Sequence, residues 1–226
     1  MRVNALSGPP GAEQMDNVAN SARMRAGAYD LLATLFREPL SATTLRSLRD
    51  PAMLEGLSEA GMALDEAFRN GDEAQLQEAL AVDYTQLFHG PRNHHPPYES
   101  VQTGGEEGEL NGDATRQVRR FFDTAGLAFD DQCPELADHL SVELACMAEL
   151  AGREAAAREA GDAVQVERRV EEQTTFLEQH LGRWVPDFGR MIEDRAETNF
   201  YRQAGRLLAG FVETELTNVP APEPIV

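Results

Sequence analysis

Apolar residues recur with a helical period along nearly the whole of this 226-residue chain. One segment carries them at i, i+3, i+4 and i+7, in the order Tyr29, Leu32, Ala33 and Phe36. No stretch alternates apolar and polar residues for long enough to indicate a strand. The sequence therefore predicts an all-α protein, a globular bundle of about eight or more helices that forms one body or two closely joined halves.

Residues that favour helix ends divide the chain into these helices. Ser21 is a candidate N-cap for the first helix, and Asp72 is one for a longer helix further on. We expect Gly126 to stop another helix and Pro134 to start the next one. A later helix is expected to end near Pro186, because proline interrupts helical hydrogen bonding.

The two ends of the chain differ in composition from its middle. Glycine and proline gather at residues 8–11, and three prolines fall in the last eight residues. We therefore expect a flexible arm over residues 1–20 and a flexible tail over residues 219–226, with the helical domain at 21–218 between them. The glycine-rich composition around residues 103–111 predicts a hinge-like loop near residues 90–112.

The charge balance excludes two classes of partner. Lys and Arg number 20 and Asp and Glu number 39, which gives a formal net charge of -19 at pH 7. Such a chain repels nucleic acids and anionic membrane surfaces and attracts cationic partners, although acidity also serves solubility. No segment approaches the roughly 20 apolar residues of a membrane span. The isolated Cys133 and Cys146 favour a reduced, cytoplasmic setting over a disulfide scaffold.

The segment 84–101 is the first candidate site. Its first residues complete a helical pattern that Gly90 and Pro91 stop, and a stiff stretch with Pro96 and Pro97 follows. A corner of this kind leaves backbone groups in need of partners beside apolar side chains. We therefore expect it to bind a segment of another chain.

The segment 137–143 is the second candidate site. On a helix His139 and Glu143 lie one turn apart and can touch, and Glu143 also lies on the apolar face. A buried carboxylate needs a partner, and a carboxylate beside His139 would favour its charged form. Two interpretations stay open: an ion pair that only stabilises the fold, or a polar spot that holds the backbone or an arginine of a bound segment.

No motif indicates an enzyme site or a metal site. The chain lacks the G-x-S-x-G, G-x-G-x-x-G and G-x-x-x-x-G-K patterns of nucleophilic, dinucleotide and phosphate-loop chemistry. Its histidines and cysteines do not have a metal-binding spacing, so we expect neither a metal nor a cofactor. A metal-dependent or nucleotide-hydrolysing enzyme with a site around His139 and Glu143 is the alternative class. Aromatic residues such as Phe122 and Trp184 are expected in the core.

Three motifs together resemble the signature of a known family. They are Leu-Phe-His-Gly-Pro at 87–91, Pro-Pro-Tyr-Glu-Ser-Val at 96–101 and Asp-His-Leu-Ser-Val-Glu at 138–143. Their order and separation resemble the TorD/DmsD family, the cytoplasmic chaperones of molybdenum-containing oxidoreductases, also called redox enzyme maturation proteins. The likeness continues at residues 176–186 and at Phe200-Tyr201, and so covers roughly residues 20–215.

The resemblance implies a chaperone without catalysis. It would bind the twin-arginine leader and the apo-form of the catalytic subunit of a molybdenum oxidoreductase, and delay export until the cofactor is inserted. The expected leader-binding residues, with Glu99 and Glu143 added from the chain itself, are Leu87, Phe88, Gly90, Pro91, Pro97, Tyr98, Glu99, Asp138, His139 and Glu143. We expect these residues to share one groove, and Phe88→Ala or His139→Ala to weaken leader binding without loss of helicity. The client, nucleotide binding and the oligomeric state, a monomer or a domain-exchanged dimer, stay open.

Overall fold

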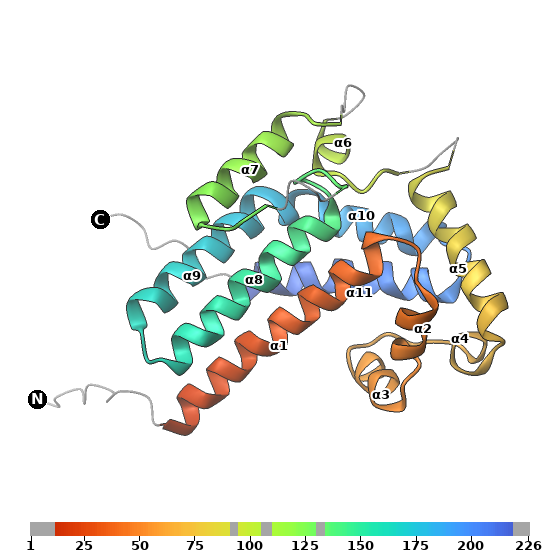
Figure 1. Ribbon diagram of the computed structural model, residues 1–226, viewed down its shortest axis with the longest axis horizontal. Helices are drawn as coiled ribbons and strands as arrows, with labels where there is room; N and C mark the ends of the chain where they lie inside the picture. Colours follow the sequence, from red (N-terminus) through yellow and green to blue (C-terminus); the bar gives the residue numbers. More distant parts are fainter. Residues whose placement is uncertain (1–11, 91–94, 105–109, 130–133, 219–226) are drawn as a thin grey trace, which may run out of the picture.

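The computed structural model describes residues 12–90, 95–104, 110–129 and 134–218, and these form helices nearly throughout (Figure 1). In chain order the helices are α1 (Ala12–Arg37), α2 (Ala42–Leu48), α3 (Pro51–Glu59), α4 (Glu66–Asn70), α5 (Glu73–Phe88), α6 (Glu99–Thr103), α7 (Asp113–Ala125), α8 (Leu140–Glu159), α9 (Ala163–Phe176), the π-helical turn η2 (Leu177–Leu181), α10 (Gly182–Arg195) and α11 (Asn199–Asn218). Within these ranges the only β-type pairing is an isolated bridge between Tyr98 and His139. The predicted all-α class is confirmed.

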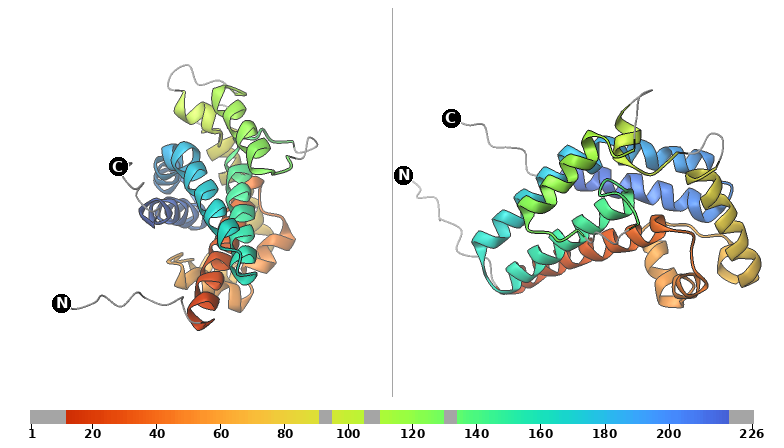
Figure 2. Two further views of the ribbon diagram at one scale, coloured as in Figure 1. Left: turned by 90° about the vertical axis from the view of Figure 1, so that its left-hand side faces the viewer. Right: turned by 45° about the horizontal axis from the view of Figure 1, so that its top comes forward.

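The longest helices lie side by side and form the body of the molecule (Figures 1 and 2). α1 packs along α8, α8 along α9, and α10 along α11. The short helices α2, α3 and α4 gather with α5 at one end (Figure 1), and α6 contacts both α7 and α10. None of the described helices is long and apolar enough to cross a membrane.

Two predicted helix ends are confirmed, and both depend on local chemistry. Asp72 is the N-cap of α5, since its carboxylate accepts a hydrogen bond from Gln75 N (2.9 Å). Gly126 ends α7 with φ of 63°, in the left-handed region that glycine enters at no steric cost. Each of these signals lies within one turn of the helix end, so the sequence alone suffices to find it.

The predicted start of the first helix at Ser21 is wrong. α1 begins before it, and residues 12–20 are helical instead of belonging to an arm. They contain neither glycine nor proline, and Ala19 and Ala22 become buried in the fold, so packing extends the helix beyond the candidate cap. Other parts of the predicted arm, hinge-like loop and tail lie outside the described residues, namely 1–11, 91–94, 105–109 and 219–226.

Pro186 lies inside α10, so the helix end predicted near it is also wrong. α9 passes through η2 directly into α10. Proline has no N–H and crowds the carbonyl of residue i−4, and a π turn just before it locally changes the hydrogen-bond register. Gly182 fits the junction, because a Cβ there would lie 2.7 Å from Leu177 O.

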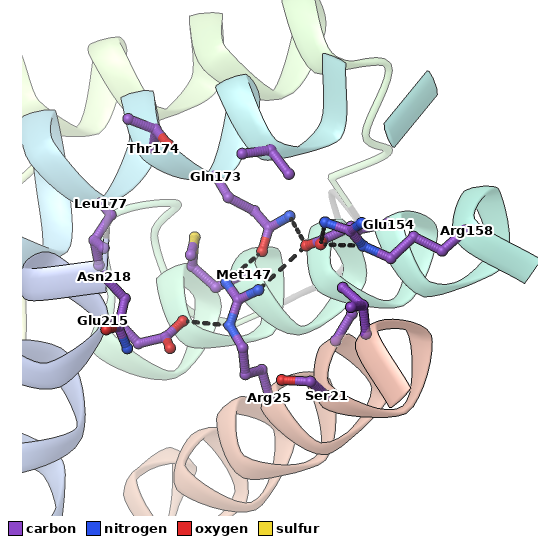
Figure 3. A pocket seen from close by; sticks show the side chains of 13 residues that line it. Ser21, Arg25, Met147, Glu154, Arg158, Gln173, Thr174, Leu177, Glu215 and Asn218 are labelled. Atoms are coloured by element: carbon purple, nitrogen blue, oxygen red, sulfur yellow. Dashed lines mark hydrogen bonds and ion pairs between the residues drawn. The ribbon is translucent and has the colours of Figure 1, made fainter. Parts of the chain in front are cut away.

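A network of charged and amide side chains fixes the bundle away from the candidate segments (Figure 3). Arg25 of α1 donates to Glu215 (2.8 Å) of α11, Glu154 (3.2 Å) of α8 and Gln173 (2.7 Å) of α9. Burial opposes the charge of Arg25, but the two carboxylates outweigh it, so its pKa is raised. These groups satisfy one another, and their role is to hold four helices together.

Candidate functional site

Two segments that are far apart in the sequence meet at one corner of the molecule. Residues 95–99 follow α5 and residues 138–140 lead into α8, and they pair in an antiparallel bridge centred on Tyr98 and His139. The backbone bonds beside it run from Leu140 N to Pro97 O (2.8 Å) and from Glu99 N to Asp138 O (3.0 Å). The two segments predicted from the sequence therefore form one structural unit.

Tyr98 and His139 share one neighbour, Glu135. Their rings pack edge to face with centres 4.9 Å apart. The Tyr98 hydroxyl donates to the Glu135 carboxylate, and His139 Nε2 lies 3.9 Å from the same carboxylate. His139 Nδ1 accepts a bond from Ser141 N (3.1 Å), which leaves the ring proton on Nε2, the nitrogen near Glu135. Burial, and then the bond to Glu135, raises the pKa of Tyr98.

The predicted helix start near His139 is wrong, and burial decides the charge of His139. The helix expected to start at Pro134 begins at Leu140, and His139 is its N-cap, because the backbone before Leu140 is engaged in the bridge. Burial lowers the pKa of His139 to about 4, although the carboxylates of Glu135 and Asp138 act in the opposite direction. The carboxylates favour the charged form as expected, but burial outweighs them, so the imidazole is neutral at pH 7.

Asp138 ties three elements together. Its carboxylate accepts bonds from Ser100 N (3.0 Å) in α6 and from the Thr115 hydroxyl (2.7 Å) in α7. The side chain is fully buried. A buried carboxylate that accepts such bonds holds backbone and side chains in place, so Asp138 fixes α6 and α7 against the start of α8.

Glu143 turns away from His139 and joins a buried cluster. Trp184 Nε1 donates to Glu143 Oε2 (3.2 Å), and His180 Nδ1 lies 2.8 Å from Glu99 Oε2. Glu99 and Glu143 are both fully buried, and one oxygen of each has no hydrogen-bond partner among the described residues. The predicted pairing of Glu143 with His139 is replaced by this cluster, which joins α6, α8, η2 and α10.

The charge in this cluster has to be balanced. Two carboxylates that face each other in a buried site need a proton or a cation to balance them, and Arg183 Nη1 lies 3.9 Å from Glu99 Oε1. Burial, and then the neighbouring Glu99, raises the pKa of Glu143 well above its ordinary value, which favours a proton shared with Glu99. Glu99, Glu143 and His180 also offer ligand atoms within 4.8 Å of one another, a spacing that a metal ion can use. The absence of a metal remains a prediction.

Leu87 and Phe88 are buried at the end of α5. Phe88 is 1% exposed, and its ring packs against rings from three other helices, namely Phe36, Phe188 and Tyr201. Leu87 O accepts a bond from His95 N (2.8 Å), which holds the corner onto α5. Phe88 therefore belongs to the core, and its truncation would affect folding before it affected binding.

Burial is what most of the predicted residues have in common. Gly90 and Pro97 are buried as well, and Pro91 lies outside the described residues. Tyr98 is the only predicted residue in the described part of the chain that is partly exposed. The predicted residues therefore form the buried interior of the corner, and only Tyr98 among those described reaches the surface in part.

A cavity of about 530 Å³ lies beside this corner, between α7 and α8. Its lining, the α7–α8 groove, includes the apolar side chains of Phe122, Leu127, Phe129, Val142, Ala145 and Cys146. The charged side chains that line it are Arg37, Glu38, Glu135 and Glu149. None of the predicted residues that the structure describes lines this groove, but Glu135 belongs both to the groove and to the corner.

The sequence contains little that singles out the groove. Phe122 is buried as expected, and Leu127 and Phe129 belong to no motif. Val142 lies within the third motif, 138–143, and was the one available signal. Partial exposure of an apolar side chain depends on which helices cover it, and spacing along the chain does not reveal that.

Comparison with known proteins identifies the family. Residues 50–190 match the family described as the nitrate reductase delta subunit. This chain belongs to that family. Relatives named chaperone protein TorD include one from Vibrio cholerae, 28% identical over 202 residues that cover 84% of this chain and 90% of the relative. Another, from Vibrio vulnificus, is 29% identical and covers 83% of this chain and 90% of the relative.

The fold recurs in a solved structure. A crystal structure of an Archaeoglobus fulgidus protein assigned to redox enzyme maturation aligns with a TM-score of 0.53 over 93% of this chain and 99% of that chain, at 21% identity. This likeness concerns the fold. The family match and the TorD relatives confirm the resemblance to the TorD/DmsD family that the three motifs indicated.

Proposed function

We propose that this member of the nitrate reductase delta subunit family is a cytoplasmic chaperone for the catalytic subunit of a molybdenum-containing oxidoreductase. It binds the twin-arginine leader and the immature body of that subunit, and delays export until the cofactor is in place. The observation that carries the proposal is the family membership, with relatives named chaperone protein TorD over most of both chains.

The geometry of the titratable groups supports binding over catalysis. The alternative enzyme would use His139 and Glu143, but both are buried, with 2% and 0% of their surface exposed. Neither lines the α7–α8 groove. General acid–base chemistry needs a group within reach of a bound substrate, and these two groups instead bond to Ser141 and Trp184.

The charge of the chain supports a cationic partner. A net charge of -19 favours association with a leader that carries arginines and disfavours nucleic acids. The chain would act as a monomer or as a dimer that exchanges halves about the segment 90–112.

Titration of leader peptides tests the proposal. The probes are synthetic leaders of the molybdenum oxidoreductase subunits of the same organism, each paired with a version in which Gln-Gln replaces Arg-Arg. We expect at least one leader to bind in isothermal calorimetry, its Gln-Gln version to bind more weakly, and its affinity to fall with added salt. If none of the leaders bound at low salt, the proposal would be wrong.

A further inference from the structure

We propose that Glu99 and Glu143 form a pH-dependent latch on α6. One proton shared between the two carboxyl groups holds α6 closed against α8 and α10, and loss of that proton as pH rises releases α6. This pair of side chains, the α6 latch, is a property of the chain by itself and does not rest on the proposed function. It makes the shape of the corner depend on pH.

The two side chains of the α6 latch come from elements that differ in how firmly they are held. Glu99 is the first residue of α6, a helix of five residues that contacts α7 and α10. Glu143 lies in α8, a helix of 20 residues that packs along both α1 and α9. Because α8 is fixed by its neighbours, α6 is the element that moves when the contact between the two carboxyl groups fails.

One oxygen of each carboxyl group lacks a hydrogen-bond partner. Glu99 Oε2 lies 2.8 Å from His180 Nδ1, and Glu143 Oε2 accepts a bond from Trp184 Nε1 (3.2 Å). The other oxygens, Glu99 Oε1 and Glu143 Oε1, are buried without a hydrogen-bond partner among the described residues. A proton between the two carboxyl groups supplies the missing donor and leaves one negative charge in the site instead of two.

The groups around the α6 latch favour this single charge. Among the described residues, the charged or titratable groups that act on the two carboxyl groups are Asp138 before α8, Cys146 of α8, His180 of η2 and Arg183 of α10. Arg183 is 54% exposed, so water weakens its attraction for Glu99. His180 can donate through Nδ1 in its neutral form as well as in its charged form. Asp138 adds to the effect of burial and of Glu99, which raise the pKa of Glu143.

Loss of the shared proton leaves two negative charges that repel each other in a buried site. Opening of α6 admits water to both carboxyl groups, and each then ionises near the ordinary value of 4.5. The open form therefore holds fewer protons above that pH, so opening becomes more favourable as pH rises. Opening also breaks the bond from Ser100 N to the Asp138 carboxylate. It thereby uncovers Asp138, a predicted leader-binding residue that the closed form buries completely.

Amide hydrogen exchange of residues 99–103 from pH 5 to pH 8 tests the α6 latch in wild type, Glu99→Gln and Glu143→Gln. The rate of each amide, divided by the rate of an unstructured amide at the same pH, gives the opening constant of α6. Glutamine keeps the size of the side chain and a donor for the opposite carboxyl group, but does not titrate. Glu149→Gln is the matched control at an exposed site on α8. EDTA in every sample removes metal ions, and the amides of α11 report on global unfolding.

We expect the opening constant of α6 in wild type to rise with pH, by up to about tenfold per pH unit. Glu99→Gln and Glu143→Gln should each abolish this rise, and either variant decides the matter if the other does not fold. Glu149→Gln should keep it, because its side chain touches neither carboxyl group.

Three results would overturn the inference. The first is an opening constant of wild type that does not change with pH. The second is a rise that persists in Glu143→Gln, which would assign the titration to His180. The third is an equal opening constant for α6 and α11, which would show that the whole protein unfolds and that α6 does not open by itself.

Discussion

Replacing Glu143 by glutamine is expected to change how the stability of this protein depends on pH. The Glu143 carboxyl is fully buried, accepts a bond from Trp184 Nε1 and faces Glu99. Burial and the neighbouring carboxylate raise its pKa well above the ordinary 4.5. Glutamine has the same shape, can donate to Glu99 as the protonated acid does, and does not titrate.

The sign and the size of the effect follow from proton linkage. In the unfolded chain Glu143 loses its proton near pH 4.5, whereas the folded protein keeps it to higher pH. Between the two pKa values the folded state holds one more proton, so its stability falls as pH rises, by about 1.4 kcal/mol per pH unit. For a chain of 226 residues this corresponds to roughly 3–5 °C in Tm per pH unit. Below pH 4.5 the contribution is fully present.

Thermal unfolding of wild type and Glu143→Gln from pH 4.5 to pH 8 tests this prediction. We expect the stability of the variant relative to wild type to rise with pH, and the same substitution at the exposed Glu149, Glu149→Gln, is measured beside it as a comparison. Trp184 is the only tryptophan in the chain, so its fluorescence reports directly on the cluster. Parallel curves for wild type and Glu143→Gln would refute the reasoning.

Two further predictions concern the same region. Phe88→Ala should lower the free energy of unfolding by about 3–5 kcal/mol, as removal of a buried ring usually does. Unfolding in guanidinium chloride measures this change, and a decrease below about 1 kcal/mol would contradict the burial of Phe88. Dialysis against EDTA should leave Tm unchanged, because a shared proton suffices to balance the negative charge of Glu99 and Glu143. A drop in Tm that added Zn²⁺ reverses would show that a metal ion is bound between them instead.

Capping residues predicted helix ends correctly where no distant contact competes with them. Asp72 and Gly126 mark helix ends through bonds or backbone angles that a single turn determines. Ser21 and Pro134 gave wrong helix starts because distant contacts decided the outcome, namely burial of the first helix and the bridge that delays α8. Pro186 gave a wrong helix end because a π turn just before it changes the hydrogen-bond register. Propensity is a weak prior where packing competes with it.

The sequence predicted which segments meet at the candidate site, but not whether their side chains reach the surface. The motifs indicated that Tyr98 and His139 belong together, and the structure pairs them directly. They did not indicate that His139 is an N-cap, because the bridge to residues 97–99 decides where α8 begins. They did not indicate that Glu143 faces Trp184, because this contact joins α8 to α10. The α7–α8 groove was missed because spacing along the chain does not reveal which apolar side chains stay partly exposed.

The π turn η2 makes the alignment of two helices depend on the exact length of one segment. It places His180 opposite Glu99 and is followed within α10 by Trp184 and Phe188. Each residue of an α-helix turns the chain by about 100°. Deleting one residue from Leu177–Leu181 would rotate all later side chains by that angle relative to α9, and so remove the indole from Glu143 and the ring of Phe188 from Phe88. This stretch should therefore tolerate substitutions more readily than changes in length.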